Sequence, residues 1–342
     1  MKLRVGVVGY GYWGSKHVRV LDSLPEVGVT VIDADPDRCM HARRTFSRVD
    51  SASRLDDALS DLDAIVIATP PSTHVALAQQ AMSAGLHVLV EKPLALTTDG
   101  CRQLMDVADS GDRILMVGHT FEYNAGIWKL REIVQSGELG ELLYVDLARL
   151  NLGLYQADVN VIWDLAPHDV SIANLLLGSR PTSVAATAEA HLRGPREDVG
   201  HLQLHYEDID VTAYIRVSWL DPAKVRRVTV VGDRKMCVSN DSSNEPIRLY
   251  DIGVEPPAED GRLHEMPLQY RYGDITLPRV NFQEPLLVQD SHFVECVRLG
   301  DRPRTDGENG MAVVSVLEAA NRSVTLGGQP VPVSMTPTAA EH

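Results

Sequence analysis

The sequence predicts an α/β protein in which a domain with a parallel sheet precedes an α+β domain built on a largely antiparallel sheet. Two observations predict this fold class. Short apolar segments alternate with helical segments up to about residue 118, which is typical of βαβ units whose sheet is buried on both faces. From about residue 141 the apolar segments are longer and alternate in polarity, which is typical of antiparallel strands with one covered face.

The first domain, expected over residues 1–120, is built from short strands and intervening helices. Pro36 suits the first turn of a helix, and Gly85 suits the end of another. The expected strands are 3–8, 27–32, 64–68, 87–90 and 114–117, and the expected helices are 13–24, 36–46, 72–84 and 97–109.

The second domain is expected over residues 121–335. Residues 251–284 are rich in Pro, Glu, Asp and Gly without a clear period, so we expect a long ordered excursion or a partner-contacting loop there. The tail after Val333 is expected to fray. The expected helices are 125–135, 166–177, 286–298 and 308–326, and the expected strands are 142–150, 182–191, 201–206, 211–219, 225–231 and 247–250.

Composition excludes several classes of protein. The 342 residues carry a net charge of -15 without a basic stripe, which disfavours binding to nucleic acid or to an anionic membrane. No apolar run approaches the about 18–20 residues of a membrane span, and a strand-like segment starts too early for a signal peptide. The four cysteines match neither zinc nor disulfide spacing, so we expect reduced thiols in the cytoplasm.

A glycine-rich turn follows the first expected strand and opens a helix. Its G-x-G-x-x-G pattern, followed 19 residues later by Asp33 at the end of the second strand, predicts a Rossmann dinucleotide-binding domain. Asp33 can accept hydrogen bonds from the ribose of NAD and would repel the extra phosphate of NADP, although Arg38 could favour that phosphate. A turn that only caps a helix is the alternative. The predicted cofactor-binding residues of the turn are Gly9, Gly11, Tyr12, Trp13 and Gly14.

A Thr-Pro-Pro loop follows the strand expected at 64–68. In an open parallel sheet the ligand lies beyond the carboxyl ends of the strands, so Thr69 and Pro70 are expected to flank the nicotinamide half of the cofactor. His74, in the first turn of the next helix, could touch the ribose or could pack at the start of the helix.

Glu91-Lys92-Pro93 follows the strand expected at 87–90, so Lys92 should stand at the same edge of the sheet. Unlike arginine, a lysine near a cofactor can give up its proton, and Lys92 could act as a general base or hold the substrate oxygen. Glu91 could pair with Lys92 or face the nicotinamide ribose. The alternative is a solvated lysine after a strand.

Asp164 and His168 are four residues apart and would share one face of a helix. A carboxylate beside an imidazole can raise its basicity, which makes His168 a candidate proton acceptor. A structural histidine and a capping Asp164 are the alternatives, and Asp169 would stabilise the same helix start. No second His or Cys stands at ligand spacing, so no metal site is expected.

The motifs described above, taken in their order along the chain, resemble those of the Gfo/Idh/MocA oxidoreductase family. The resemblance covers nearly the whole chain. The resemblance implies hydride transfer between NAD and a secondary alcohol or ketone of a sugar or polyol. It also implies that Lys92 holds the reacting oxygen, His168 exchanges its proton and Asp164 positions the group. The family often carries an Asp three residues after the His, where this chain has Ser171.

Four further segments refine this resemblance: residues 119–124, 149–153, 158–169 and 273–275. They are similar to the branch that acts at C-3 of nucleotide-linked sugars, of the UDP-N-acetylglucosaminuronate 3-dehydrogenase or TDP-sugar 3-ketoreductase type. An inositol or free-sugar dehydrogenase and a non-catalytic NAD(H) sensor are the alternatives. Arg149, Arg193 and Arg196 could bind a diphosphate or could be solvated surface residues. The resemblance implies a homodimer or homotetramer built on exposed sheet faces. The residues expected to line the sugar pocket are Tyr123, Asn124, Arg149 and Asn151.

Overall fold

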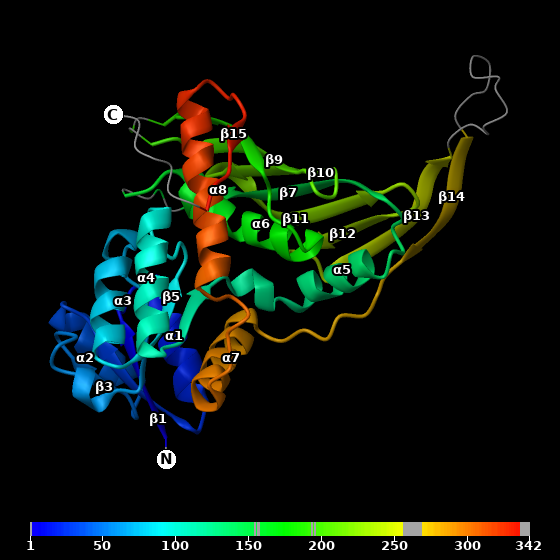
Figure 1. Ribbon diagram of the computed structural model, residues 1–342. Helices are drawn as coiled ribbons and strands as arrows, with labels where there is room; N and C mark the ends of the chain where they lie inside the picture. Colours follow the sequence, from blue (N-terminus) through cyan, green and yellow to red (C-terminus); the bar gives the residue numbers. More distant parts are fainter. Residues whose placement is uncertain are drawn as a thin grey trace. The chain divides into compact units, whose positions relative to one another are not determined.

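The computed structural model describes residues 2–153, 155, 158–192, 194, 196–255 and 269–335, and divides the chain into two compact units (Figure 1). The first unit runs to Tyr123 and resumes with Gln283–Glu318. The second unit contains Asn124–Phe282 and Ala319–Val333. This division differs from the sequence expectation of 1–120 and 121–335, because residues near the carboxyl end return to the first unit.

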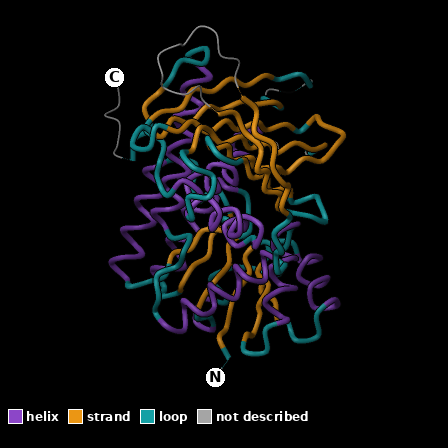
Figure 2. Tube along the Cα trace, turned by 90° about the vertical axis from the view of Figure 1, so that its right-hand side faces the viewer, coloured by secondary structure: helices purple, strands orange, loops and turns teal. Residues whose placement is uncertain are grey.

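The described strands of the first unit form one parallel sheet in the order β3-β2-β1-β4-β5-β6. This order is that of a Rossmann fold and confirms the predicted fold class. Figure 2 shows its strands lying between helices. The three-residue strand β3 was missed because so short a segment carries no periodicity. The strands are β1 (Leu3–Val8), β2 (Val27–Ile32), β3 (Asp50–Ala52), β4 (Ala64–Ile67), β5 (His87–Glu91) and β6 (Leu115–Gly118).

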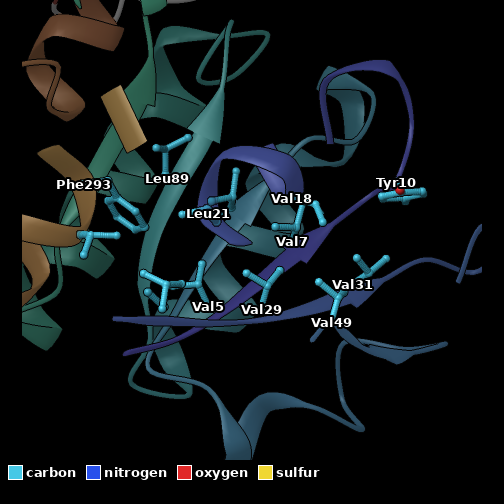
Figure 3. Close-up of a cluster of buried hydrophobic side chains, with 14 of the residues drawn as sticks. Val5, Val7, Tyr10, Val18, Leu21, Val29, Val31, Val49, Leu89 and Phe293 are labelled. Atoms are coloured by element: carbon cyan, nitrogen blue, oxygen red, sulfur yellow. The ribbon is translucent and has the colours of Figure 1, made fainter. Parts of the chain in front are cut away.

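The helices of this unit have apolar faces that pack on the sheet. The buried cluster in Figure 3 holds Val5 and Val7 of β1, Leu21 of α1 and Phe293 of α7. Because Phe293 is fully buried in that cluster, α7 belongs to the first unit's core although it follows 159 residues of the second. The helices are α1 (Tyr12–Ser23), α2 (Pro36–Thr45), α3 (His74–Ser83), α4 (Thr98–Gly111), α7 (Pro285–Leu299) and the first part of α8 (Gly307–Thr325), with short 3-10 turns η1 (Leu59–Asp61), η2 (Pro71–Thr73) and η3 (Thr120–Tyr123).

In the part of the second unit that is described, one sheet has the order β14-β13-β12-β11-β7-β10-β9-β8-β15. Its pairs are antiparallel except β7 with β10, so the largely antiparallel sheet is confirmed. Helix α6 (Val161–Leu177) packs on β7, β9 and β10, and α5 (Ala125–Gln135) packs on β12 and β13. The strands are β7 (Leu142–Leu152), β8 (Ser183–Glu189), β9 (Val199–Tyr206), β10 (Val211–Ser218), β11 (Leu220–Gly232), β12 (Met236–Asn240), β13 (Ile247–Glu255), β14 (Gln269–Thr276) and β15 (Val331–Pro332).

The expectation for 251–284 was wrong over its described strands, where β13 and β14 pair in an antiparallel ladder. Strand β14 lies at the edge of the sheet and exposes Tyr270, Tyr272 and Ile275, so it lacks the alternation of buried and exposed residues that identifies a strand. Residues 256–268 of that segment and the tail from 336 lie outside the described residues. Among the described helices, none is long and apolar enough to cross a membrane.

Candidate cofactor and substrate site

The turn between β1 and α1 requires glycine at two positions. Gly9 has φ +91°, and a Cβ there would lie 2.8 Å from the carbonyl oxygen of Ala68. A Cβ at Gly14 would lie 1.8 Å from the carbonyl oxygen of Gly9, so the helix approaches the turn closely. Beside Gly11, the N-cap residue of α1, there is open space, and this residue makes no side-chain hydrogen bond to the helix. The N–H groups at this helix start are therefore oriented to bind a pyrophosphate.

Tyr12 and Trp13 occupy the first turn of α1, and their side chains are exposed. The two rings contact each other edge to face, with 5.6 Å between centroids. The Lys16 ammonium lies 4.2 Å from the centre of the Tyr12 ring. An aromatic and cationic surface therefore adjoins the predicted pyrophosphate site.

Asp33 directly follows β2, and its carboxylate is bound to the glycine turn. Its Oδ2 accepts a hydrogen bond of 2.7 Å from the Tyr10 N–H, and its Oδ1 accepts one of 2.9 Å from the Asp35 N–H. The Arg38 guanidinium lies 3.5 Å from Oδ2. A cavity of about 390 Å³ opens here, lined by Tyr10, Gly11, Ser15, Asp37, Arg38 and His41. These features fit the adenosine half of NAD.

His74 joins the loops that follow β4 and β5. Its Nδ1 lies 2.9 Å from the carbonyl oxygen of Pro93, and its Nε2 lies 2.9 Å from that of Thr69. The ring is buried, and burial lowers its pKa despite these hydrogen bonds. Both ring nitrogens contact main-chain oxygens, which favours the packing role over contact with the ribose. Pro70 lies in the loop that His74 secures.

Glu91 is the last residue of β5, and Lys92 follows it half-buried at the carboxyl edge of the sheet. The Lys92 N–H donates to Glu91 Oε2 at 3.2 Å, and the Lys92–Pro93 peptide is cis. The other carboxylate oxygen, Oε1, lies 2.9 Å from His17 Nε2. Glu91 therefore contacts the Lys92 main chain and a histidine.

Two buried histidines near this edge were not predicted from the sequence. His17 lies on the buried face of α1 and forms ion pairs with Glu91 and Asp290. His119 follows β6, and within the described residues neither of its ring nitrogens has a hydrogen-bond partner. Burial lowers the pKa of His119 to about 4. For His17, the only sequence signal was a histidine on an otherwise apolar helix face. For His119, the only signal was its position directly after a strand.

In the second unit, α6 places Asp164 and His168 one turn apart. Asp164 Oδ2 accepts a hydrogen bond of 3.0 Å from the indole N–H of Trp219. The helix is capped by Asn160, whose Oδ1 accepts from the Trp163 N–H at 3.1 Å, so the capping alternative for Asp164 was wrong. His168 is 8% exposed. The indole fixes the carboxylate one turn before His168.

Arg149 of β7 forms a buried ion pair with Asp169 of α6. Two parallel hydrogen bonds of 2.9 Å join Nε and Nη2 to the two carboxylate oxygens, and both residues are less than 5% exposed. Burial raises the pKa of Asp169, although Arg149 opposes that rise. Asp169 therefore pairs with β7, which corrects its expected role in stabilising the helix start, and Arg149 has a structural partner. Arg193 lies outside the described residues.

Tyr123 and Asn124 have contacts within the protein. The Tyr123 hydroxyl lies 3.1 Å from Thr305 Oγ1, and burial raises its pKa. Asn124 caps α5 by accepting hydrogen bonds of 2.8 and 3.2 Å from the N–H groups of Gly126 and Ile127. These contacts support structural roles for both, whereas Asn151 is only half-buried on β7.

The expected site residues are therefore distributed between the two units. The glycine turn, Asp33, His74 and Lys92 belong to the first unit, and Asn151, Asp164 and His168 belong to the second. Among the described residues, no group of three or more His, Cys, Asp or Glu side chains is placed to hold a metal ion.

Comparison with known proteins identifies the family. A sequence model of the oxidoreductase family with an NAD-binding Rossmann fold matches residues 3–119, and the Gfo/Idh/MocA C-terminal domain matches residues 127–238. The chain therefore belongs to the Gfo/Idh/MocA oxidoreductase family, and its first unit contains an NAD-binding Rossmann domain. This confirms the resemblance, the oxidoreductase class and the cofactor.

Individual relatives differ in what they act on. UDP-N-acetylglucosamine 3-dehydrogenase of Acidithiobacillus ferrooxidans is 33% identical over 55% of this chain and 58% of its own length. That alignment spans little more than half of the relative. Inositol 2-dehydrogenase of Rhizobium meliloti is 24% identical over 95% of this chain and 97% of its own. The crystal structure of GenD2 from gentamicin A biosynthesis, in complex with NAD, is 27% identical with a TM-score of 0.82, covering 97% of each chain.

Proposed function

We propose that this protein is an NAD-dependent dehydrogenase or ketoreductase acting at C-3 of a nucleotide-linked sugar. The observation that carries the proposal is the position of Lys92, half-buried at the carboxyl edge of the parallel sheet whose first turn fits a pyrophosphate. The UDP-N-acetylglucosamine 3-dehydrogenase relative supports the choice of sugar class and carbon.

In the proposed mechanism, the glycine turn and Asp33 would hold NAD, which would supply the hydride acceptor for the sugar carbon. The Lys92 ammonium holds the sugar oxygen and stabilises negative charge as it develops. His168 takes the hydroxyl proton as general base, and Asp164 orients the reacting group. The alcohol thus loses a hydride and a proton and becomes a ketone, and the reverse transfer reduces a ketone. The indole of Trp219 fixes the Asp164 carboxylate.

An inositol or free-sugar dehydrogenase is the second candidate. The Rhizobium inositol 2-dehydrogenase aligns with almost the whole chain, and the pairing of Arg149 with Asp169 removes one expected contact to a diphosphate. A side-by-side kinetic panel separates the two candidates. UDP- and TDP-linked hexoses, free hexoses and myo-inositol are each incubated with NAD, and NADH absorbance is followed. Nucleotide-linked sugars should give the highest kcat/KM, and faster turnover of myo-inositol would favour the second candidate.

Lys92→Met tests the catalytic role directly. Loss of the ammonium should lower kcat by about 10²–10⁴-fold, since it removes a group that stabilises the transition state, and NAD affinity should change little. Lys129→Met is the matched control, because Lys129 forms an exposed ion pair with Glu132 on α5. Unchanged kcat in Lys92→Met would reject the mechanism. NAD binding without turnover of any sugar would instead support a non-catalytic sensor.

We further propose a homodimer or homotetramer in the cytoplasm. Tyr144 and Tyr214 are 40% and 44% exposed and pack edge to face on neighbouring strands of the second unit's sheet. All four cysteines are buried thiols, which suits a reducing compartment. Sedimentation at micromolar protein concentration tests the assembly, and a monomer would contradict it.

A further inference from the structure

We propose that His17 is a positioning residue for the proposed reaction: as an imidazolium held between Glu91 and Asp290, it fixes Glu91 and, through Glu91, the main chain at Lys92. This inference rests on the proposed function for its catalytic consequence, but the arrangement itself is testable without turnover. Its members come from α1, β5 and α7, all within the first unit.

The hydrogen-bond geometry of the His17 ring fits the doubly protonated form. Nε2 lies 2.9 Å from Glu91 Oε1, and Nδ1 lies 3.0 Å from both carboxylate oxygens of Asp290. A neutral imidazole has one N–H and one lone pair, so one carboxylate would face a lone pair. Only the imidazolium donates to both. The geometry therefore matches a cation between two carboxylates.

Burial makes this arrangement costly to disturb. The side chains of His17, Glu91 and Asp290 are 0%, 8% and 1% exposed. Burial alone would lower the pKa of His17, but the charges and hydrogen bonds of Asp290 and Glu91 outweigh it and raise that pKa to about 10. Burial also raises the pKa of Asp290, with the His17 charge opposing the rise. Removing one member would leave an uncompensated buried charge.

Both carboxylates are held by further contacts. Gln289 Nε2 donates to Asp290 Oδ1 at 3.4 Å, and Gln289 Oε1 accepts from the Thr120 hydroxyl at 2.8 Å. On the other side, a Cβ at Gly118 would lie 3.1 Å from Glu91 Oε1, so β6 packs tightly against that carboxylate. His119 and His74 are also within electrostatic range of Glu91, whose charge opposes the fall in the pKa of each ring, while the Lys92 charge adds to it.

One further hydrogen bond links this arrangement to Lys92 of the proposed site. With Oε1 bound to His17, Glu91 Oε2 accepts the N–H of Lys92 at 3.2 Å. The main chain that carries the Lys92 ammonium is therefore tied to α7 through two carboxylates and one imidazolium. A shift of about 1 Å in a catalytic group can cost about 100-fold in rate, so loss of this tie should reduce turnover more than binding.

The charge state is tested first, on the whole protein. Nitrogen-15 NMR of histidine-labelled wild type, assigned by His17→Gln, should show both His17 ring nitrogens protonated at pH 8.5, where ordinary histidines are neutral. Asp290→Asn should move the His17 titration to lower pH. A neutral His17 ring at pH 7.5 in wild type would overturn the proposal.

The positioning role is tested by exchange and kinetics. In His17→Gln and Asp290→Asn, the Lys92 amide should exchange with solvent at least about tenfold faster. The kcat for the best sugar should fall about 10–100-fold, with KM and NAD affinity within about threefold. His87→Gln, at the opposite end of β5, is the matched control and should change neither quantity.

The outcomes separate the two proposals. Slow exchange at Lys92 and full kcat in both variants would reject the positioning role while the proposed function stands. An absence of turnover in wild type would reject the proposed function, and the NMR and exchange results would still decide the arrangement. If His17→Gln fails to fold, Asp290→Asn and wild-type NMR provide the test.

Discussion

Two buried charge arrangements, one in each unit, differ in how they respond to pH. In the first unit, His17 lies between Glu91 and Asp290, and Glu91 directly precedes Lys92. In the second, Arg149 pairs with Asp169, which directly follows His168. An arginine keeps its charge at any ordinary pH, whereas a histidine can lose its proton. Each arrangement holds the main chain beside a proposed catalytic residue. Only the first should lose its positive charge at high pH, because its cation is a histidine.

Breaking the Arg149–Asp169 pair should give the largest change in stability. Arg149→Met leaves Asp169 charged and buried without its partner, so the free energy of unfolding should fall by about 3–5 kcal/mol in urea denaturation. Replacing both residues by apolar ones should recover most of that loss. Lys235→Met, which removes a more exposed ion pair with Glu138, should cost less than about 1 kcal/mol. A loss in Arg149→Met no larger than in this control would show that the buried pair contributes little.

The contribution of the His17 arrangement to the free energy of unfolding should depend on pH. The pKa of His17 is raised to about 10 in the folded protein against about 6.5 unfolded. Folded protein therefore binds one more proton between these values, so the contribution of His17 is complete below pH 6.5 and is lost as pH rises toward 10. The stability difference between wild type and His17→Gln should shrink by at most about 1.4 kcal/mol per pH unit over this window. A stability difference between wild type and His17→Gln that stays constant with pH would contradict this account. The corresponding difference for Arg149→Met should not change over the same pH window.

The smallest expected effect concerns Trp219 of the second unit, whose indole contacts Asp164, one turn before His168 on α6. Trp219→Phe removes the indole N–H that donates to Asp164, which should cost about 1 kcal/mol of stability. The kcat should fall by up to about tenfold, because the Asp164 carboxylate is no longer fixed. Trp128→Phe on α5, which alters a half-buried indole of the same unit, is the control. Equal effects of the two substitutions would show that the indole acts by packing alone.

The sequence predicted well where local pattern determines structure. The glycine turn, Asp33 and the strand-end position of Lys92 follow from motifs that are contiguous in the chain, and the parallel sheet follows from regular alternation. The partners of Arg149 and of His17 could not be predicted, because Asp169 is 20 residues away and Asp290 is 273 residues away in sequence. The return of α7 to the first unit depends on Phe293, whose apolar character does not indicate which core it joins.

The most direct test of the proposed reaction uses a UDP-linked hexose carrying deuterium at C-3. Wild-type protein is incubated with this sugar and NAD, and the NADH formed is examined by mass spectrometry and NMR. If hydride passes from C-3 to the nicotinamide, the NADH carries the deuterium and Lys92→Met forms it far more slowly. Turnover that yields unlabelled NADH would contradict oxidation at C-3, and the absence of any NADH across the panel would contradict the proposed activity itself.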